Sequence, residues 1–255
     1  MTNKPSQMFL IGGGWNPEAF RFTYGPFVES SARDGRRRIA IVVVLEQDTD
    51  KTEQEANYRG ALETLGVTHD EVVPVFLSES RPLSLKMLSE INPTGLLVCG
   101  GLTPLYQELL CGDGDWVSYL LERDLPYCGF SAGSAIVAGK AVVGGWKATV
   151  NGAHRPIVDE EVSEELELLT VRDGLGWLPF SIDVHCGQWG TITRLIHAVT
   201  GGMIECGVGI DENTMLQVNG DTISVHGLGQ VYRVRRGSDV GVTVEIFRDG
   251  VTIDM

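Results

Sequence analysis

Apolar runs alternate with amphipathic segments over the first two thirds of the chain. Some runs, such as Val42-Val43-Val44, contain no polar position, which is typical of strands covered on both faces. The pattern predicts strands over residues 8–12, 38–45, 71–77, 95–98 and 126–130, separated by helices over residues 26–33, 52–65, 83–90, 104–110 and 116–122. This alternation predicts an α/β fold with a mostly parallel sheet and helices on both faces. Functional residues are then expected at the carboxyl ends of the strands.

The pattern changes after about residue 141, where turn signals become frequent. The acidic segment 159–169 is expected to be a solvated helix, followed by a strand over 180–185 and a helix over 191–199. From residue 204 onward the sequence predicts only short strands, which form antiparallel hairpins at the edge of the sheet. No linker or repeat interrupts the sequence, so residues 1–255 are expected to form a single domain.

Composition and charge exclude several classes of protein. The 255 residues are 43% hydrophobic, which is enough for a full core, yet no apolar run is long enough to span a bilayer. The net charge of −14 argues against nucleic acid as a partner. The amino-terminal residues lack the features of a signal peptide, and the five cysteines are scattered without metal-ligand spacing. We therefore expect a cytoplasmic protein that uses neither a metal nor a cofactor.

One heptapeptide, Gly129-Phe130-Ser131-Ala132-Gly133-Ser134-Ala135, carries the strongest chemical signal. It follows a predicted strand and leads into small residues, 135–139, that can begin a helix. A G-x-S-x-G turn between a strand and a helix is typical of a nucleophile elbow, where glycines avoid collisions and the serine oxygen is exposed. The helix N-terminus beneath the turn favours developing negative charge. Ser131 is therefore the predicted nucleophile.

A serine nucleophile also needs donors for the oxyanion that forms when it attacks a carbonyl. The pair Gly100-Gly101 follows a predicted strand, and glycine there leaves a backbone N–H free to approach the reacting carbonyl. We predict an oxyanion hole made by the N–H groups of Gly101 and of Ala132, the residue after the nucleophile. The glycine pair is also explained by a turn that needs positive φ, and the two roles are compatible because the turn aims the N–H.

His185 is the predicted base among five histidines. It ends the apolar strand predicted over 180–185, so it is expected at the same edge of the sheet as Ser131. The other histidines are expected to have surface or packing roles: His69, His154, His197 and His226. Of these, His154 lies in a predicted loop and stays a weaker candidate for the base.

Two places supply an acid that can orient this base. Asp183 lies two residues before His185 and shares its strand face, although its side chain is expected to point into the sheet layer. The second place is the loop Asp211-Glu212-Asn213, just after the apolar run at residues 207–210. A carboxylate in that loop can accept the second ring N–H of His185 and stabilise the imidazolium. The residues alone leave both choices open.

The ordered set of motifs resembles the peptidase E and cyanophycinase group of serine peptidases. The resemblance covers most of the chain and rests on IGGG at 11–14, CGG at 99–101, GFSAGSA at 129–135, GLGWLPFSIDVH at 174–185, RL at 194–195 and GVGIDENT at 207–214. It implies a three-layer α/β/α sandwich of the class I glutamine amidotransferase type. It also implies a Ser-His-Glu triad, which falls on Ser131, His185 and Glu212.

The sequence departs from the family around the substrate site. Cyanophycinases follow the histidine with phenylalanine and an arginine-rich stretch, whereas here only Arg194 remains of those arginines. The asparagine common after the paired glycines is Leu102, and the acid that dipeptidase E proteins carry shortly after the nucleophile is absent. The triad therefore transfers to this chain, but neither specificity pocket does.

Substrate choice is expected to depend on residues near the base and on Leu102. The predicted substrate-binding residues are Leu102, Asp183, Gln188, Trp189 and Arg194. Arg194 either holds a substrate carboxylate in bidentate fashion or forms a salt bridge on its helix. Trp189 supplies apolar area where related peptidases carry a cation, which favours a less acidic substrate, or it packs the helix onto the sheet.

These residues favour a serine hydrolase that cleaves a peptide or amide bond in a small substrate through an acyl-enzyme on Ser131. Two alternatives stay open: a binding protein that keeps the scaffold without the chemistry, and an acyltransferase in which an amine replaces water. The expected partner is the small peptide or amide, with a homodimer as an open alternative, and neither nucleic acid nor a membrane is expected to bind.

Overall fold

A computed structural model describes residues 4–45, 51–112, 114–237 and 241–255. Its largest sheet contains β1 (Gln7–Ile11), β2 (Ile39–Val44), β3 (Val72–Leu77), β4 (Gly95–Val98), β5 (Tyr127–Phe130), β12 (Thr214–Asn219), β13 (Thr222–Gly227) and β16 (Thr252–Ile253). Their order is β16-β13-β12-β1-β5-β4-β2-β3. Strands β1 to β5 pair in parallel, and β12, β13 and β16 extend the sheet antiparallel beyond β1. The predicted α/β fold with a mostly parallel sheet and antiparallel hairpins is confirmed.

The helices of the described chain are short, apart from α3. They are α1 (Phe20–Thr23), α2 (Gly25–Ser30), α3 (Lys51–Thr64), α4 (Leu85–Ile91), α5 (Thr103–Leu110), α6 (Trp116–Glu122), α7 (Ala132–Ala135), α8 (Cys186–Trp189) and α9 (Ile192–Thr200), with 3-10 turns η1 (Pro17–Ala19), η2 (His69–Glu71) and η3 (Glu160–Val162). No described helix is both long and apolar enough to cross a membrane.

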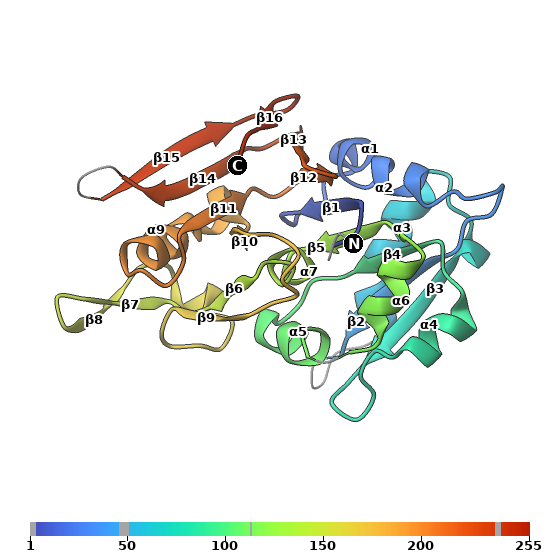
Figure 1. Ribbon diagram of the computed structural model, residues 1–255, viewed down its shortest axis with the longest axis horizontal. Coiled ribbons are helices and arrows are strands. Elements are labelled where there is room, and N and C mark those ends of the chain that lie inside the picture. Colours follow the sequence, from blue (N-terminus) through green and yellow to red (C-terminus); the bar gives the residue numbers. More distant parts are fainter. Residues whose placement is uncertain (1–3, 46–50, 113, 238–240) are drawn as a thin grey trace.

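Helices cover both faces of the large sheet. Phe27 of α2 packs edge-on against Phe9 of β1, with ring centroids 5.9 Å apart. Tyr127 of β5 is in register with the residue before Phe9, so it points to the opposite face. There it contacts Trp177, which in turn contacts Trp116 of α6. The core therefore has a layer of helices on each side of the sheet (Figure 1).

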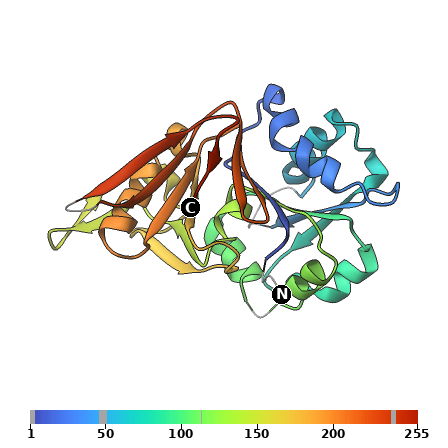
Figure 2. The same cartoon turned by 45° about the horizontal axis from the view of Figure 1, so that its top comes forward.

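A second sheet was not predicted. It contains β10 (Ser181–Val184), β11 (Cys206–Ile210), β14 (Val231–Arg236) and β15 (Val242–Phe247), in the order β10-β11-β14-β15. Helix α9 packs on it and forms a small core of its own around Leu195, Val199 and Val234. Two views show this orange and red part beside the blue and green part (Figures 1 and 2). Of the predicted hairpins, β12–β13 extends the large sheet and β14–β15 belongs to the second one.

Two smaller, two-stranded sheets lie in the chain between α7 and β10. Strand β6 (Lys140–Gly144) pairs antiparallel with β9 (Thr170–Asp173), and β7 (Lys147–Val150) pairs antiparallel with β8 (Ala153–Pro156). The segment between β8 and β9 carries the acidic residues that the sequence suggested would form a helix.

That helix over residues 159–169 is a wrong prediction. Only the single turn η3 is helical, and Glu164 and Glu165 both have left-handed backbone angles, with φ of 56° and 59°. A continuous helix would place Glu160 beside Glu164 and Glu161 beside Glu165, and like charges four residues apart destabilise a helix. The segment instead folds as an irregular loop.

The expected helix after the elbow is also shorter and earlier than predicted. Helix α7 spans Ala132–Ala135, a single turn, and the chain enters β6 at Lys140. Four residues align few peptide dipoles, so the helix contributes little of the charge stabilisation that the sequence suggested. Individual backbone N–H groups at the turn are left to supply it.

Candidate active site

The elbow has the backbone geometry that its glycines predict. Ser131 lies between β5 and α7 with φ of 51° and ψ of −111°, a conformation that side-chain-bearing residues rarely adopt. A Cβ atom on Gly129 would lie 2.4 Å from the carbonyl oxygen of Gly133, and one on Gly133 would lie 2.2 Å from that of Val98. Both flanking positions therefore require glycine.

The strain at Ser131 leads to a stability prediction. Glycine adopts this conformation without steric cost, whereas a non-glycine residue there costs about 1–3 kcal/mol. Because glycine also loses more backbone entropy on folding, we expect Ser131→Gly to be more stable than Ser131→Ala by roughly 1 kcal/mol. Urea denaturation of the two variants measures this difference. An alanine variant as stable as the glycine variant would show that the turn is not strained.

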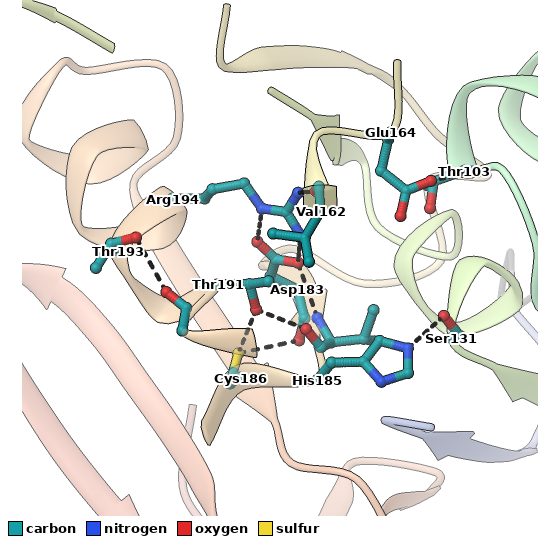
Figure 3. Close-up of polar contacts among 12 residues, drawn as sticks. Thr103, Ser131, Val162, Glu164, Asp183, His185, Cys186, Thr191, Thr193 and Arg194 are labelled. Carbon is teal, nitrogen blue, oxygen red and sulfur yellow. Dashed lines mark hydrogen bonds and ion pairs between the residues drawn. The ribbon is translucent and has the colours of Figure 1, made fainter. Parts of the chain in front are cut away.

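Three predicted residues form one chain of hydrogen bonds. The Oγ atom of Ser131 lies 2.9 Å from Nε2 of His185, and Nδ1 of His185 lies 2.8 Å from Oε1 of Glu212 (Figure 3 draws the first of these). Of the acids that the sequence left open, Glu212 is the one that contacts the imidazole, whereas Asp211 accepts the N–H of Gly187. The side chain of His185 is only 8% exposed, so the imidazole itself is largely shielded from water.

The carboxyl end of β1 holds these three residues together. The carbonyl of Ile11 accepts the N–H of Ser131 at 2.9 Å, and the carbonyl of Gly12 accepts the N–H of His185 at 3.0 Å. The carbonyl of Gly13 accepts the N–H of Asn213, next to Glu212, at 2.7 Å. Three consecutive carbonyls thus fix three segments that are distant in sequence, and they join the large sheet to the second one.

Burial lowers the pKa of His185 below its ordinary value, and the hydrogen bond that the imidazole donates to Glu212 opposes that shift without cancelling it. The imidazole is therefore neutral near pH 7. A neutral ring with its proton on Nδ1 donates to Glu212 and leaves Nε2 to accept the proton of Ser131. This protonation state suits a general base.

Two tyrosine hydroxyls hold the glycine loop beside the elbow. The hydroxyl of Tyr58 accepts the N–H of Gly100 at 2.7 Å, and the hydroxyl of Tyr106 donates to the carbonyl of Gly100 at 2.9 Å. Within the described part of the chain, the N–H groups of Gly101 and Ala132 have no hydrogen-bond acceptor. These are the two donors that the sequence predicted for an oxyanion.

A cavity of about 600 Å³ opens over Ser131. It is lined by Gly14, Trp15, Tyr58, Gly100, Gly101, Leu102, Phe130, Ser131, Glu161, Val162, Ser163, Glu164, Glu165, His185, Trp189 and Glu212. Leu102 and Trp189, two of the predicted substrate-binding residues, are in this lining. Its ionisable side chains are four glutamates, His185 and Tyr58, and among the described residues no lysine or arginine lines it.

Asp183 and Arg194 lie outside that lining and pair with each other. The guanidinium of Arg194 donates from Nε and Nη2 to the two carboxylate oxygens of Asp183, each at 2.8 Å, and from Nη1 to the carbonyl of Val162 at 3.0 Å (Figure 3). Both residues are almost fully buried. Of the two interpretations of Arg194, this geometry favours the salt bridge, and its partner Asp183 lies on β10.

Gln188 is also outside the cavity lining, and it binds the backbone of Glu212. Its Oε1 accepts the N–H of Glu212 at 2.8 Å, and the neighbouring N–H of Gly187 donates to Oδ1 of Asp211 at 2.7 Å. These two bonds tie the turn of α8 to the loop that carries Glu212.

Several lining residues were not predicted from the sequence. Trp15 packs against Phe130 and Tyr58, with ring centroids 4.7 Å and 4.8 Å apart, and together they form an aromatic wall. Trp15 follows the glycines at the end of the first predicted strand, which is a usable signal because functional loops lie there. Glu164 accepts the N–H of Thr103 at 2.8 Å, and nothing in the acidic segment distinguished it from its neighbours. Burial raises the pKa of Glu164.

Comparison with known proteins supports the fold. No protein-family model matches this chain. A solved structure, the crystal structure of a peptidase from an acI-B1 Actinobacterium, has a TM-score of 0.68 and covers 100% of this chain and 99% of its own, at 14% sequence identity. At that identity the likeness shows a shared fold over the whole chain.

Among the described residues, no group of three or more His, Cys, Asp or Glu is arranged to hold a metal ion.

Proposed function

We propose that this protein is a serine hydrolase that cleaves a peptide or amide bond in a small substrate. The observation that carries the proposal is the hydrogen-bonded chain from Ser131 through His185 to Glu212 at the floor of an open cavity. The peptidase with the same fold and the motif resemblance to the peptidase E and cyanophycinase group support the same reaction class.

The reaction follows from the positions of these groups. Ser131 Oγ attacks the substrate carbonyl while His185 Nε2 takes its proton, and Glu212 stabilises the imidazolium that forms. The N–H groups of Gly101 and Ala132 bind the oxyanion of the tetrahedral intermediate. His185 then gives its proton to the leaving amine, which departs and leaves an acyl group on Ser131. Water activated by the same imidazole hydrolyses this ester and restores the free serine.

The cavity favours a neutral or cationic substrate. Three carboxylates from the acidic loop, Glu161, Glu164 and Glu165, line it beside the aromatic wall. A substrate carboxylate would be repelled by these groups and would meet no described lysine or arginine in the lining. This agrees with the less acidic substrate that Trp189 suggested from the sequence.

A fluorophosphonate probe tests the proposal directly. The wild-type protein is expected to be labelled on Ser131, as located by mass spectrometry, and the Ser131→Ala variant is expected to stay unlabelled. Digestion of a peptide library then identifies the cleaved bond, and added amines distinguish hydrolysis from acyl transfer by their products. A correctly folded wild-type protein that the probe does not label would instead support a binding protein without chemistry.

The lowered pKa of His185 predicts how activity depends on pH. Only the neutral imidazole accepts a proton, so kcat/KM is expected to fall as the pH drops through the pKa of His185 in the free enzyme. Because burial lowers that pKa, the midpoint of the acid limb is expected below the ordinary histidine value of about 6.5. Measuring kcat/KM between about pH 4.5 and 8 locates this midpoint. A midpoint clearly above the ordinary value would contradict the neutral, buried base.

A further inference from the structure

The imidazole of His185 is enclosed between two surfaces. The indole of Trp189 stacks on one face, with ring centroids 3.7 Å apart and an angle of 6° between the planes. Gly13 covers the other face so closely that a Cβ atom there would lie 2.1 Å from Cε1 of His185. The ring is therefore confined from both sides as well as at its two nitrogens.

The local backbone creates this stack. His185 has a left-handed conformation, with φ of 55°, and caps the single turn of α8. The N–H of Trp189 donates to the carbonyl of His185 at 2.8 Å, which closes the turn and brings the two side chains to the same side. Because Gln188 in the same turn accepts the backbone N–H of Glu212, the segments that carry the indole, the imidazole and the Glu212 carboxylate are hydrogen-bonded to one another.

Hydrogen bonds alone do not fix the orientation of this ring. The bonds at Nδ1 and Nε2 lie at nearly opposite sides of the imidazole, so they leave the ring free to tilt about the axis that joins them. Contact with the two faces removes that tilt. When the ring takes the proton of Ser131, its positive charge also lies against the indole face, an arrangement that attracts a cation.

We propose that Trp189 is a positioning residue that holds the imidazole of His185 in the plane of its two hydrogen bonds and stabilises the imidazolium during acylation. This inference rests on the proposed function, and it gives Trp189 a different task from the substrate binding suggested by the sequence. The indole is 41% exposed and lines the cavity, so it is placed to contact a substrate as well as the imidazole. An experiment can compare these two roles directly.

The experiment compares Trp189→Leu with Trp189→Phe. Leucine keeps apolar cover over the imidazole but offers no aromatic face, whereas phenylalanine keeps the face. We expect Trp189→Leu to lower both kcat and the rate of fluorophosphonate labelling about tenfold, with KM changed less than about twofold, and Trp189→Phe to stay within about threefold of wild type. Thermal melting of both variants establishes that the folded proteins are being compared.

A second measurement does not depend on turnover. Titration of the His185 ring by NMR is expected to give a pKa about half a unit lower in Trp189→Leu than in Trp189→Phe, because only phenylalanine keeps the attraction for the protonated ring. The charged groups that face this ring, Glu212, Asp183 and Arg194, are unchanged in both variants.

The outcomes separate the interpretations. A raised KM with unchanged kcat and unchanged labelling in Trp189→Leu would make Trp189 a substrate-binding residue and overturn the proposal. Equal pKa values for His185 in the two variants would overturn the stabilisation of the imidazolium. If the probe labels no form of the protein, the proposed hydrolase function fails, and the NMR comparison then decides on its own whether the stack acts on His185.

Discussion

Ser131→Ala and His185→Ala are each expected to lower kcat by about 10⁶-fold, and the double variant is expected to lose no more than either alone. In the proposed mechanism the two side chains act as one unit, and they are in contact at 2.9 Å. Without His185 the serine is not deprotonated, and without Ser131 the imidazole has no nucleophile to deprotonate. Steady-state kinetics on the two single variants and the double variant, with melting curves to control for folding, measure the effect. Losses that multiply in the double variant would mean that the residues act independently.

Within the same series, Glu212→Gln is expected to cost less, about 10⁴-fold in kcat. Glutamine keeps the side-chain shape but lacks the charge that stabilises the imidazolium, while the oxyanion donors remain. Asp183→Asn is the matched comparison, because this second candidate acid is bound to Arg194 and not to the imidazole nitrogen. A larger loss of kcat in folded Asp183→Asn than in Glu212→Gln would assign the orienting role to Asp183.

Arg194→Met is expected to lower the free energy of unfolding by about 3–5 kcal/mol, because it leaves the carboxylate of Asp183 buried without its partner. The side chains of this pair are only 4% and 2% exposed. Lys140→Met is the matched control, since Lys140 pairs with Asp173 at 2.6 Å on the surface and should contribute less than about 1 kcal/mol. Urea denaturation of both variants gives the comparison.

The pH dependence of that loss provides a further check. Burial already raises the pKa of Asp183 even with Arg194 present, and removing the guanidinium raises it further. A carboxyl whose pKa is higher in the folded than in the unfolded state lowers the free energy of unfolding as the pH rises above its unfolded-state pKa. That free energy is recovered as the pH falls. The Arg194→Met variant should therefore be less destabilised near pH 4 than at pH 7. An equal loss at both values would mean that packing, and not the unpaired charge, explains the effect.

The sequence was informative where one local rule dominates. Runs without polar positions mark strands buried on both faces, and the elbow glycines mark a turn that no larger residue fits, so Ser131 could be located directly. His185 was found because it ends an apolar strand, although that strand belongs to the second sheet and not to the large one. Its place beside Ser131 depends on the hydrogen bond to Gly12, which no pattern reveals.

Choices between neighbouring residues needed the structure. Asp183 lies within a predicted strand and Glu212 follows another, and only the fold decides which carboxylate contacts the imidazole. Arg194 had two equal interpretations because its partner lies eleven residues away, on a different element. The loop with Glu164 was predicted as a helix since composition suggested a solvated acidic face, whereas its path is set by contacts such as the one with Thr103.

The three carbonyls at the end of β1 also affect when Ser131, His185 and Glu212 can come together during synthesis. Strand β1 is made before the other strands of the large sheet, yet it lies between β5 and β12, and β12 begins only at Thr214. Contacts so far apart in sequence form late, after the chain that links them has emerged. Until then the nascent chain has its serine and histidine but lacks the acid and one whole side of the sheet. The proposed hydrolase would therefore complete the hydrogen-bonded chain of Ser131, His185 and Glu212 only late in its synthesis.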